Sequence, residues 1–165
     1  MTKTSVMNKK HLLLFAFFAL SFNLLYAQSL KGWTWSDYKM KFQAPNDFSI
    51  KESSGTIFSA GNDHLMLTIY PKKGENLTYT GLKDALQKWA RSNNVDWNSN
   101  DLGYMSNLNR YWGYYIDGTG SNGLPTSLLL LVDPDYPEYS FYVWLQYQSG
   151  YLDTAVDILK SFKPM

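Results

Sequence analysis

Three acidic residues lie within six positions, namely Asp133, Asp135 and Glu138. Their carboxylates could bind a metal ion or take part in catalysis. They fall in an expected turn, and calcium takes about six to eight oxygen ligands, which commonly come from such loops. Two prolines in the same turn favour a rigid polar connection without a metal instead. A second possible chemistry is hydrolysis, in which Asp133 and Asp135 would be catalytic carboxylates and would have to converge in one cleft. Residues 117–123 form another oxygen-rich turn of the same kind.

The only histidine after residue 27 is His64, so a relay of serine, histidine and carboxylate would have to include it. His64 opens an expected strand after a turn, where an exposed structural histidine is the simpler interpretation. Asp153 and Asp157 lie one helical turn apart and could act as an acid–base pair, but this spacing is also typical of a solvated helix face. The chain has no cysteine, which excludes disulfides and thiolate metal ligands. We therefore expect no catalytic residue and no cofactor.

Aromatic residues are frequent after residue 27, where the chain contains 12 Tyr, 6 Trp and 5 Phe. If one face of a sheet is uncovered, such rings form a stacking surface for a sugar ring or an apolar partner. If a helix covers that face, the same rings form an aromatic core. Two expected strands carry the densest set, and our candidate ligand or partner surface consists of Tyr111, Trp112, Tyr114, Tyr142 and Trp144.

The segment 1–27 has the pattern of a secretory signal peptide. Lys9 and Lys10 precede the apolar run Leu12–Leu20, and Ala27 provides a small residue at the expected cleavage site. The alternative is a retained membrane anchor, but a spanning helix needs roughly 20 apolar residues, and this segment is shorter and interrupted by polar residues. We expect a secreted or periplasmic protein that does not span the membrane after cleavage.

Removal of residues 1–27 leaves 12 basic and 14 acidic residues, a net charge of −2. This charge without a basic cluster argues against a nucleic-acid partner. The remaining segment, 28–165, has the length of one domain and can bury a core without disulfides. An exported protein without cysteine is more typical of a bacterial envelope than of an animal secretion.

The periodicity of apolar residues predicts strands, a helix, more strands and a closing helix. After a lead-in at residues 28–37, strands are expected at 38–42, 48–51, 56–60 and 64–70. An apolar stripe predicts a helix over 82–91 with Thr80 as its cap. Further strands are expected at 102–107, 111–117, 127–132 and 139–147, before a helix over 152–159. Short turns between strands favour an α+β domain with a mostly antiparallel sheet.

Two segments resemble the PsbP-like family, whose fold is shared with a Ran-binding nuclear import factor and with bacterial envelope proteins. The segment Phe42-Gln43-Ala44-Pro45-Asn46-Asp47-Phe48 is similar to the opening strand and proline turn of that family, and Ile158-Leu159-Lys160-Ser161-Phe162-Lys163 is similar to its closing helix. The resemblance implies one domain over residues 38–165, with a central antiparallel sheet between helices. It carries over no catalytic or metal-binding residue.

Members of this family are mostly binding or assembly factors, so the resemblance favours a binding or accessory module of a bacterial envelope without catalytic activity. The expected partner is an envelope protein or a glycan, held by the aromatic strands. The alternative is a hydrolase of cell-wall or glycan material that uses Asp133 and Asp135.

Overall fold

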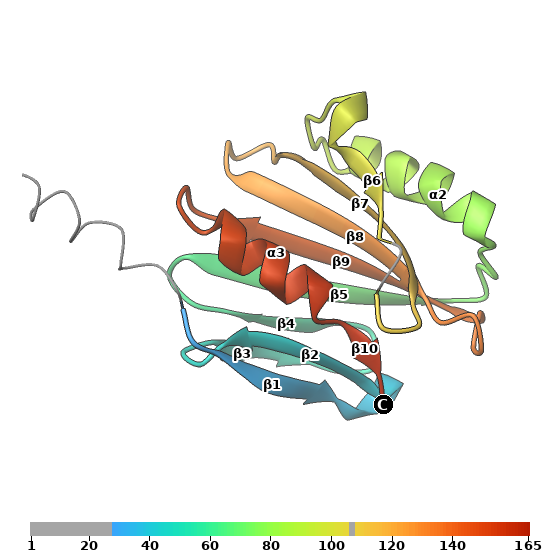
Figure 1. Cartoon of the computed structure of the whole chain (residues 1–165), viewed down its shortest axis with the longest axis horizontal. Helices are drawn as coiled ribbons and strands as arrows, with labels where there is room; N and C mark the ends of the chain where they lie inside the picture. Colours follow the sequence, from blue (N-terminus) through green and yellow to red (C-terminus); the bar gives the residue numbers. More distant parts are fainter. Residues whose placement is uncertain (1–27, 106–107) are drawn as a thin grey trace, which may run out of the picture.

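The structure is a computed structural model that describes residues 28–105 and 108–165, so the predicted signal peptide lies outside the described residues. The described part forms two sheets with helices on both sides of the larger one (Figure 1). Its strands are β1 (Leu30–Trp35), β2 (Met40–Pro45), β3 (Ser49–Ser53), β4 (Phe58–Gly61), β5 (Leu65–Lys73), β6 (Leu102–Tyr104), β7 (Trp112–Thr119), β8 (Pro125–Val132), β9 (Tyr139–Tyr147) and β10 (Lys163–Pro164). Its helices are α2 (Tyr79–Ser92), α3 (Leu152–Lys160) and the short 3-10 helices η1 (Ser36–Tyr38) and η2 (Ser99–Asp101).

The larger sheet contains seven strands in the order β3-β4-β5-β9-β8-β7-β6, and all of its neighbouring strands are antiparallel. The smaller sheet has the order β1-β2-β10 and is also antiparallel. The predicted α+β class with a mostly antiparallel sheet and helices on its faces is therefore confirmed. No helix among the described residues is long and apolar enough to cross a membrane.

The larger sheet is covered on both faces by different elements. Helix α2 lies on one face, and α3 lies with the smaller sheet on the other (Figure 1). Strand β9 shows the reason, because its side chains alternate between two hydrophobic clusters. Val143 and Leu145 belong to the cluster that contains α3, whereas Tyr142 belongs to the one that contains α2. Residues 139–147 are apolar on both faces because each face of β9 is covered, as the sequence predicted.

The segment expected as a lead-in, residues 28–37, contains strand β1, which pairs along its whole length with β2. Trp35 is 2% exposed, and Trp33 stacks on Phe42 with ring centroids 6.4 Å apart. The two tryptophans therefore fix β1 to the core. The alternation that marks a strand is weak here because most of the other residues in β1 are exposed.

Helix α2 begins at Tyr79, three residues before the start that the apolar stripe predicts. Thr78 caps it rather than Thr80, because the Thr78 hydroxyl accepts a hydrogen bond from the backbone N–H of Gly81 at 3.3 Å. The stripe itself is as predicted, and its fully buried members are Leu82, Leu86 and Ala90. The closing helix α3 agrees with the predicted segment to within one residue.

Replacement of Thr78 by alanine is expected to lower the free energy of unfolding by about 0.5–2 kcal/mol, because an N–H at the start of α2 loses its acceptor. Replacement of Thr80 by alanine is the matched control. Thr80 lies inside the first turn, where alanine is the better helix former, so a change within about 0.5 kcal/mol is expected. Urea denaturation followed by circular dichroism measures both values. Equal losses in the two variants would contradict the assignment of Thr78 as the cap.

Candidate functional site

The five aromatic residues singled out from the sequence lie on both faces of the larger sheet. Tyr111 is 4% exposed and belongs to the cluster on the α3 side. Tyr142 is 3% exposed and lies beneath α2. Trp112, Tyr114 and Trp144 are half-buried on the same α2 side. The structure therefore places Tyr111 and Tyr142 in the core, and only the other three remain available for contact with a ligand or partner.

Tyr142 has a structural role that explains its burial. Its hydroxyl donates to the Glu75 carboxylate, with a distance of 2.9 Å to Oε2, and Lys72 Nζ lies 4.3 Å from the centre of its ring. Burial, followed by the hydrogen bond to Glu75, raises the pKa of Tyr142 above its usual value. The ring and its hydroxyl thus hold the segment that leads from β5 to α2.

Helix α2 packs on β7 and β8, and within residues 28–105 and 108–165 no helix covers the β4–β5 side of the same face. A shallow hollow of about 550 Å³ lies there, which we call the Trp144 surface. Its residues are Met66, Thr68, Tyr70, Lys72, Trp89, Asn93, Trp144 and Gln146. Trp89 from α2 meets Trp144 edge to face, with ring centroids 5.8 Å apart. The sequence indicated Trp89 only as part of the helix stripe, and its place beside Trp144 depends on where α2 docks.

A second aromatic cluster surrounds the first turn of α2. Tyr79 is 39% exposed and contacts Tyr104 and Trp112, with ring centroids 4.9 Å and 6.1 Å away. Tyr104 in turn contacts Tyr114 at 5.2 Å. Burial, together with the neighbouring Tyr79, raises the pKa of Tyr104 and of Tyr114. These rings pack against one another at the start of α2. The predicted contact residues Trp112 and Tyr114 belong to this cluster and do not line the Trp144 surface.

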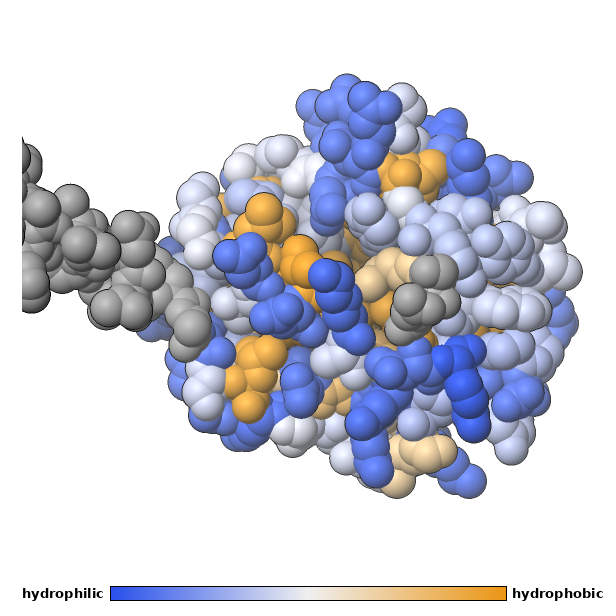
Figure 2. Space-filling view, in the orientation of Figure 1, coloured by the Kyte–Doolittle hydropathy of each residue, from blue (hydrophilic) through white to orange (hydrophobic). Residues whose placement is uncertain are grey.

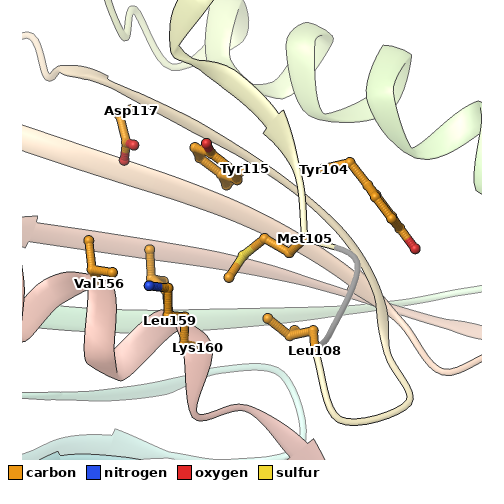
Figure 3. Close-up of a pocket in the computed structure, with 8 residues that line it drawn as sticks. All are labelled: Tyr104, Met105, Leu108, Tyr115, Asp117, Val156, Leu159 and Lys160. Atoms are coloured by element: carbon orange, nitrogen blue, oxygen red, sulfur yellow. The ribbon is translucent and has the colours of Figure 1, made fainter.

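On the opposite face of the sheet, a pocket of about 490 Å³ opens between α3 and the β6–β7 edge, and we call it the α3 pocket (Figure 3). Hydrophobic residues are visible on the surface along α3 and beside the pocket (Figure 2). The lining of the α3 pocket is mostly apolar and includes Met105, Leu108, Tyr115, Val156 and Leu159. Asp117 lies at one end, Lys160 lies on the helix side, and the Tyr104 side chain points away from the cavity (Figure 3).

The strand side of the α3 pocket depends on one glycine. Gly103 on β6 pairs with Tyr115 on β7, and a Cβ built on Gly103 would overlap the Tyr115 ring. The absence of a side chain at position 103 therefore lets this ring lie across β6. The pairing joins residues on two different strands, so it could not be predicted from the pattern of either segment.

Asp117 was expected at the junction of a strand over 111–117 and a turn over 117–123, and it lies within β7, which continues to Thr119. It belongs to a partly buried polar group below the pocket. Ser127, which is 1% exposed, donates from Oγ to Asp117 Oδ1 at 2.5 Å. Burial raises the pKa of Asp117, and the charge of Asp101 raises it further, while the hydrogen bond from Ser127 opposes the shift. Burial also raises the pKa of Tyr147, to which the charge of Asp117 contributes. Alternation along β7 could have indicated this inward-facing carboxylate.

The acidic turn after β8 is held by ion pairs. Asp133 is 6% exposed, and its Oδ2 lies 3.4 Å from Arg110 Nη2 while its Oδ1 accepts from the Asp135 N–H at 3.0 Å. Glu138 pairs instead with Lys73 at 3.7 Å. All three acids line one hollow, but the described residues contain no group of three or more acidic, histidine or cysteine side chains placed to hold a metal. The calcium interpretation is therefore not supported, and Asp133 serves to hold the turn.

The remaining candidates for chemistry also have structural surroundings. His64 Nδ1 lies 3.1 Å from Gln148 Oε1, and its ring stacks on Tyr151 with centroids 4.5 Å apart. This arrangement fastens the start of β5 to the segment before α3. Asp153 and Asp157 are exposed on the outer side of α3, which agrees with a solvated helix face.

No protein-family model matches the chain, and no curated protein matches it in sequence. Solved structures with a similar fold include a protein from Bacteroides thetaiotaomicron, with a TM-score of 0.51, 14% identity and 82% of this chain aligned. The alignment covers 48% of that protein, so the chain spans about half of its length.

Two further structures are those of a point mutant of the protein Mog1, with a TM-score of 0.56, and of the Saccharomyces cerevisiae Ran-binding protein Mog1p, with a TM-score of 0.52. Each is 6% identical to this chain, and the alignments cover 82% of this chain and 95% of the other. The fold implied by the resemblance is thus confirmed. Membership of the PsbP-like family stays a prediction.

Proposed function

We propose that the chain is a non-catalytic accessory module of a bacterial envelope that docks a protein partner on the Trp144 surface. The observation that carries this proposal is the half of the α2 face that no described helix covers, where two tryptophans, a tyrosine and a methionine lie together. Aromatic residues and methionine are enriched where proteins bind one another, and tryptophan and tyrosine often dominate the binding energy.

The composition of the surface favours a protein partner. Among the described residues that line it, Lys72 alone is charged, and depletion of charge is typical of the centre of a protein interface. Tyr70 is 39% exposed, so a large aromatic ring is already available at the surface. Thr68 and Gln146 lie among the rings and supply the hydrogen-bonding groups that such interfaces use.

The fold gives independent support, because the similar Mog1p structure is described as a Ran-binding protein. A protein with a similar fold therefore has a binding role, which supports the proposal. Likeness of fold does not transfer a partner, so the partner proposed here is a protein of the envelope. Export rests on the leader pattern of residues 1–27, with Gln28 as the first residue of the mature chain.

Photo-crosslinking in intact cells tests the proposal. A photoreactive phenylalanine at position 70 is expected to give one discrete protein adduct. The additional substitution Trp144→Ala should reduce that adduct by about tenfold or more, because the loss of a central aromatic anchor typically costs at least about 2 kcal/mol of binding. Adduct yield is measured by immunoblot, and the attached protein is identified by mass spectrometry.

The matched control carries the photoreactive residue at Asp157, which is exposed on α3 at the opposite face. It should give no adduct of the same mass. A protein adduct that persists with Trp144→Ala, equal adducts from positions 70 and 157, or an attached glycan in place of a protein would refute the docking proposal. N-terminal sequencing of the same samples should show that the chain begins at Gln28. An intact leader would refute cleavage.

A further inference from the structure

The α3 pocket has the size and composition of a small-molecule site. Its volume of about 490 Å³ lies within the roughly 300–1,000 Å³ that is common for such sites. Its walls are apolar over most of their extent, and the partly buried carboxylate of Asp117 lies at one end (Figure 3). It lies on the face of the sheet opposite the Trp144 surface, so protein docking on α2 does not use it.

The carboxylate of Asp117 at the polar end of the pocket has no ion-pair partner among the described residues. Asp117 Oδ1 accepts from Ser127, but Oδ2 has no hydrogen bond to any residue within 28–105 or 108–165. None of the three ion pairs in those same ranges includes Asp117. The negative charge of Asp101 also repels the Asp117 carboxylate electrostatically. A partly buried carboxylate without a cation is costly, and a positive group beside it would remove much of that cost.

Lys160 does not supply that positive group. It lines the pocket from α3, but its side chain is exposed and forms no ion pair with Asp117. Asp117 therefore offers a carboxylate oxygen that can accept a hydrogen bond, and the charge of Asp101 makes its surroundings more negative. Tyr115, Val156 and Leu159 form an apolar wall beside it. This combination suits a molecule with an apolar body and a cationic head.

We propose that the α3 pocket binds a small apolar amine, with the ammonium at Asp117 Oδ2 and the apolar body between α3 and Tyr115. The ammonium donates to the open carboxylate oxygen, while Met105, Leu108 and Leu159 enclose the body. A carboxylate head is disfavoured at this end of the pocket, because it would lie against Asp117 and be repelled further by the charge of Asp101.

Isothermal titration calorimetry on the mature chain, residues 28–165, tests this with three probes that share an indole ring and differ in the head group. Tryptamine carries an ammonium, tryptophol a hydroxyl and indole-3-propionate a carboxylate. Tryptamine is expected to bind at least about tenfold more tightly than indole-3-propionate, a difference of about 1.4 kcal/mol. Tryptophol is expected to fall between them, because it donates a hydrogen bond without a charge.

Two variants assign the binding to this pocket. Asp117→Asn removes the charge, and Val156→Trp fills the cavity from a half-buried position, so each should weaken tryptamine by about tenfold or more. Asp157→Asn, on the exposed side of the same helix, should leave it unchanged. Circular dichroism and thermal unfolding confirm that each variant is folded. Absence of tryptamine binding, equal binding of the carboxylate, or tight binding retained in either pocket variant would overturn the proposal and leave the docking surface unaffected.

Discussion

Replacement of Phe42 by alanine is expected to lower the free energy of unfolding by about 3–5 kcal/mol, which is the typical cost of removing a buried phenylalanine ring. Phe42 is 2% exposed, and its ring lies 5.2 Å from that of Phe162 and 5.4 Å from that of Phe58. Phe42 lies in β2, Phe58 lies in β4, and Phe162 lies between α3 and β10. The ring therefore joins the smaller sheet to the larger one, and its loss would leave a cavity between them.

Gln43 provides the matched control, since it is exposed on the same strand and its side chain is not part of the core. Its backbone N–H donates to Ser161 Oγ, a bond that survives replacement of the side chain. Gln43→Ala should therefore change the free energy of unfolding by less than about 0.5 kcal/mol. Guanidinium denaturation followed by tryptophan fluorescence measures both variants. Equally small losses for Phe42→Ala and Gln43→Ala would show that the sheets are held together elsewhere.

The sequence predicted the elements whose side chains alternate or repeat strongly. The apolar alternation of residues 64–70 and 139–147 corresponds to β5 and β9, and the two helical stripes correspond to α2 and α3. The smaller sheet was not predicted, because residues 28–37 were expected as a lead-in and because β10 pairs with β2 across most of the chain. Lys163 in β10 lies opposite Lys41 in β2, and nothing in the local pattern of either segment specifies the other.

The candidate surface could be predicted only in part. Tyr111 and Trp112 are neighbours near the start of β7 and lie on opposite faces of the sheet, an outcome that the period of two already implies. Which rings are covered depends on the placement of α2 over β7 and β8. The burial of Tyr142 and the partial exposure of Trp144 therefore followed only from the structure. The α3 pocket depends in the same way on a contact between Gly103 and Tyr115 that spans two strands.

Leu86→Ala is expected to cost about 2–5 kcal/mol of unfolding free energy, because Leu86 is fully buried in the stripe that holds α2 on the sheet. Helix propensity works against this loss, since alanine is the better helix former, so a measured decrease reflects packing alone. Lys88→Ala, at an exposed position of the same helix, removes a side chain without opening the core. Its free energy of unfolding should stay within about 0.5 kcal/mol of that of the parent chain.

The Leu86 variant also connects stability to the proposed docking surface. Trp89 is one helical turn from Leu86 and contacts both Tyr142 and Trp144, with ring centroids 5.0 Å and 5.8 Å away. A loosened α2 would let Trp89 move away from Trp144, so the photo-crosslink at position 70 should weaken even at temperatures where the domain remains folded. Lys88→Ala should leave the crosslink intact. If Leu86→Ala lowers stability and the crosslink stays at full yield, partner binding does not depend on α2, and the docking surface is then confined to β5 and β9.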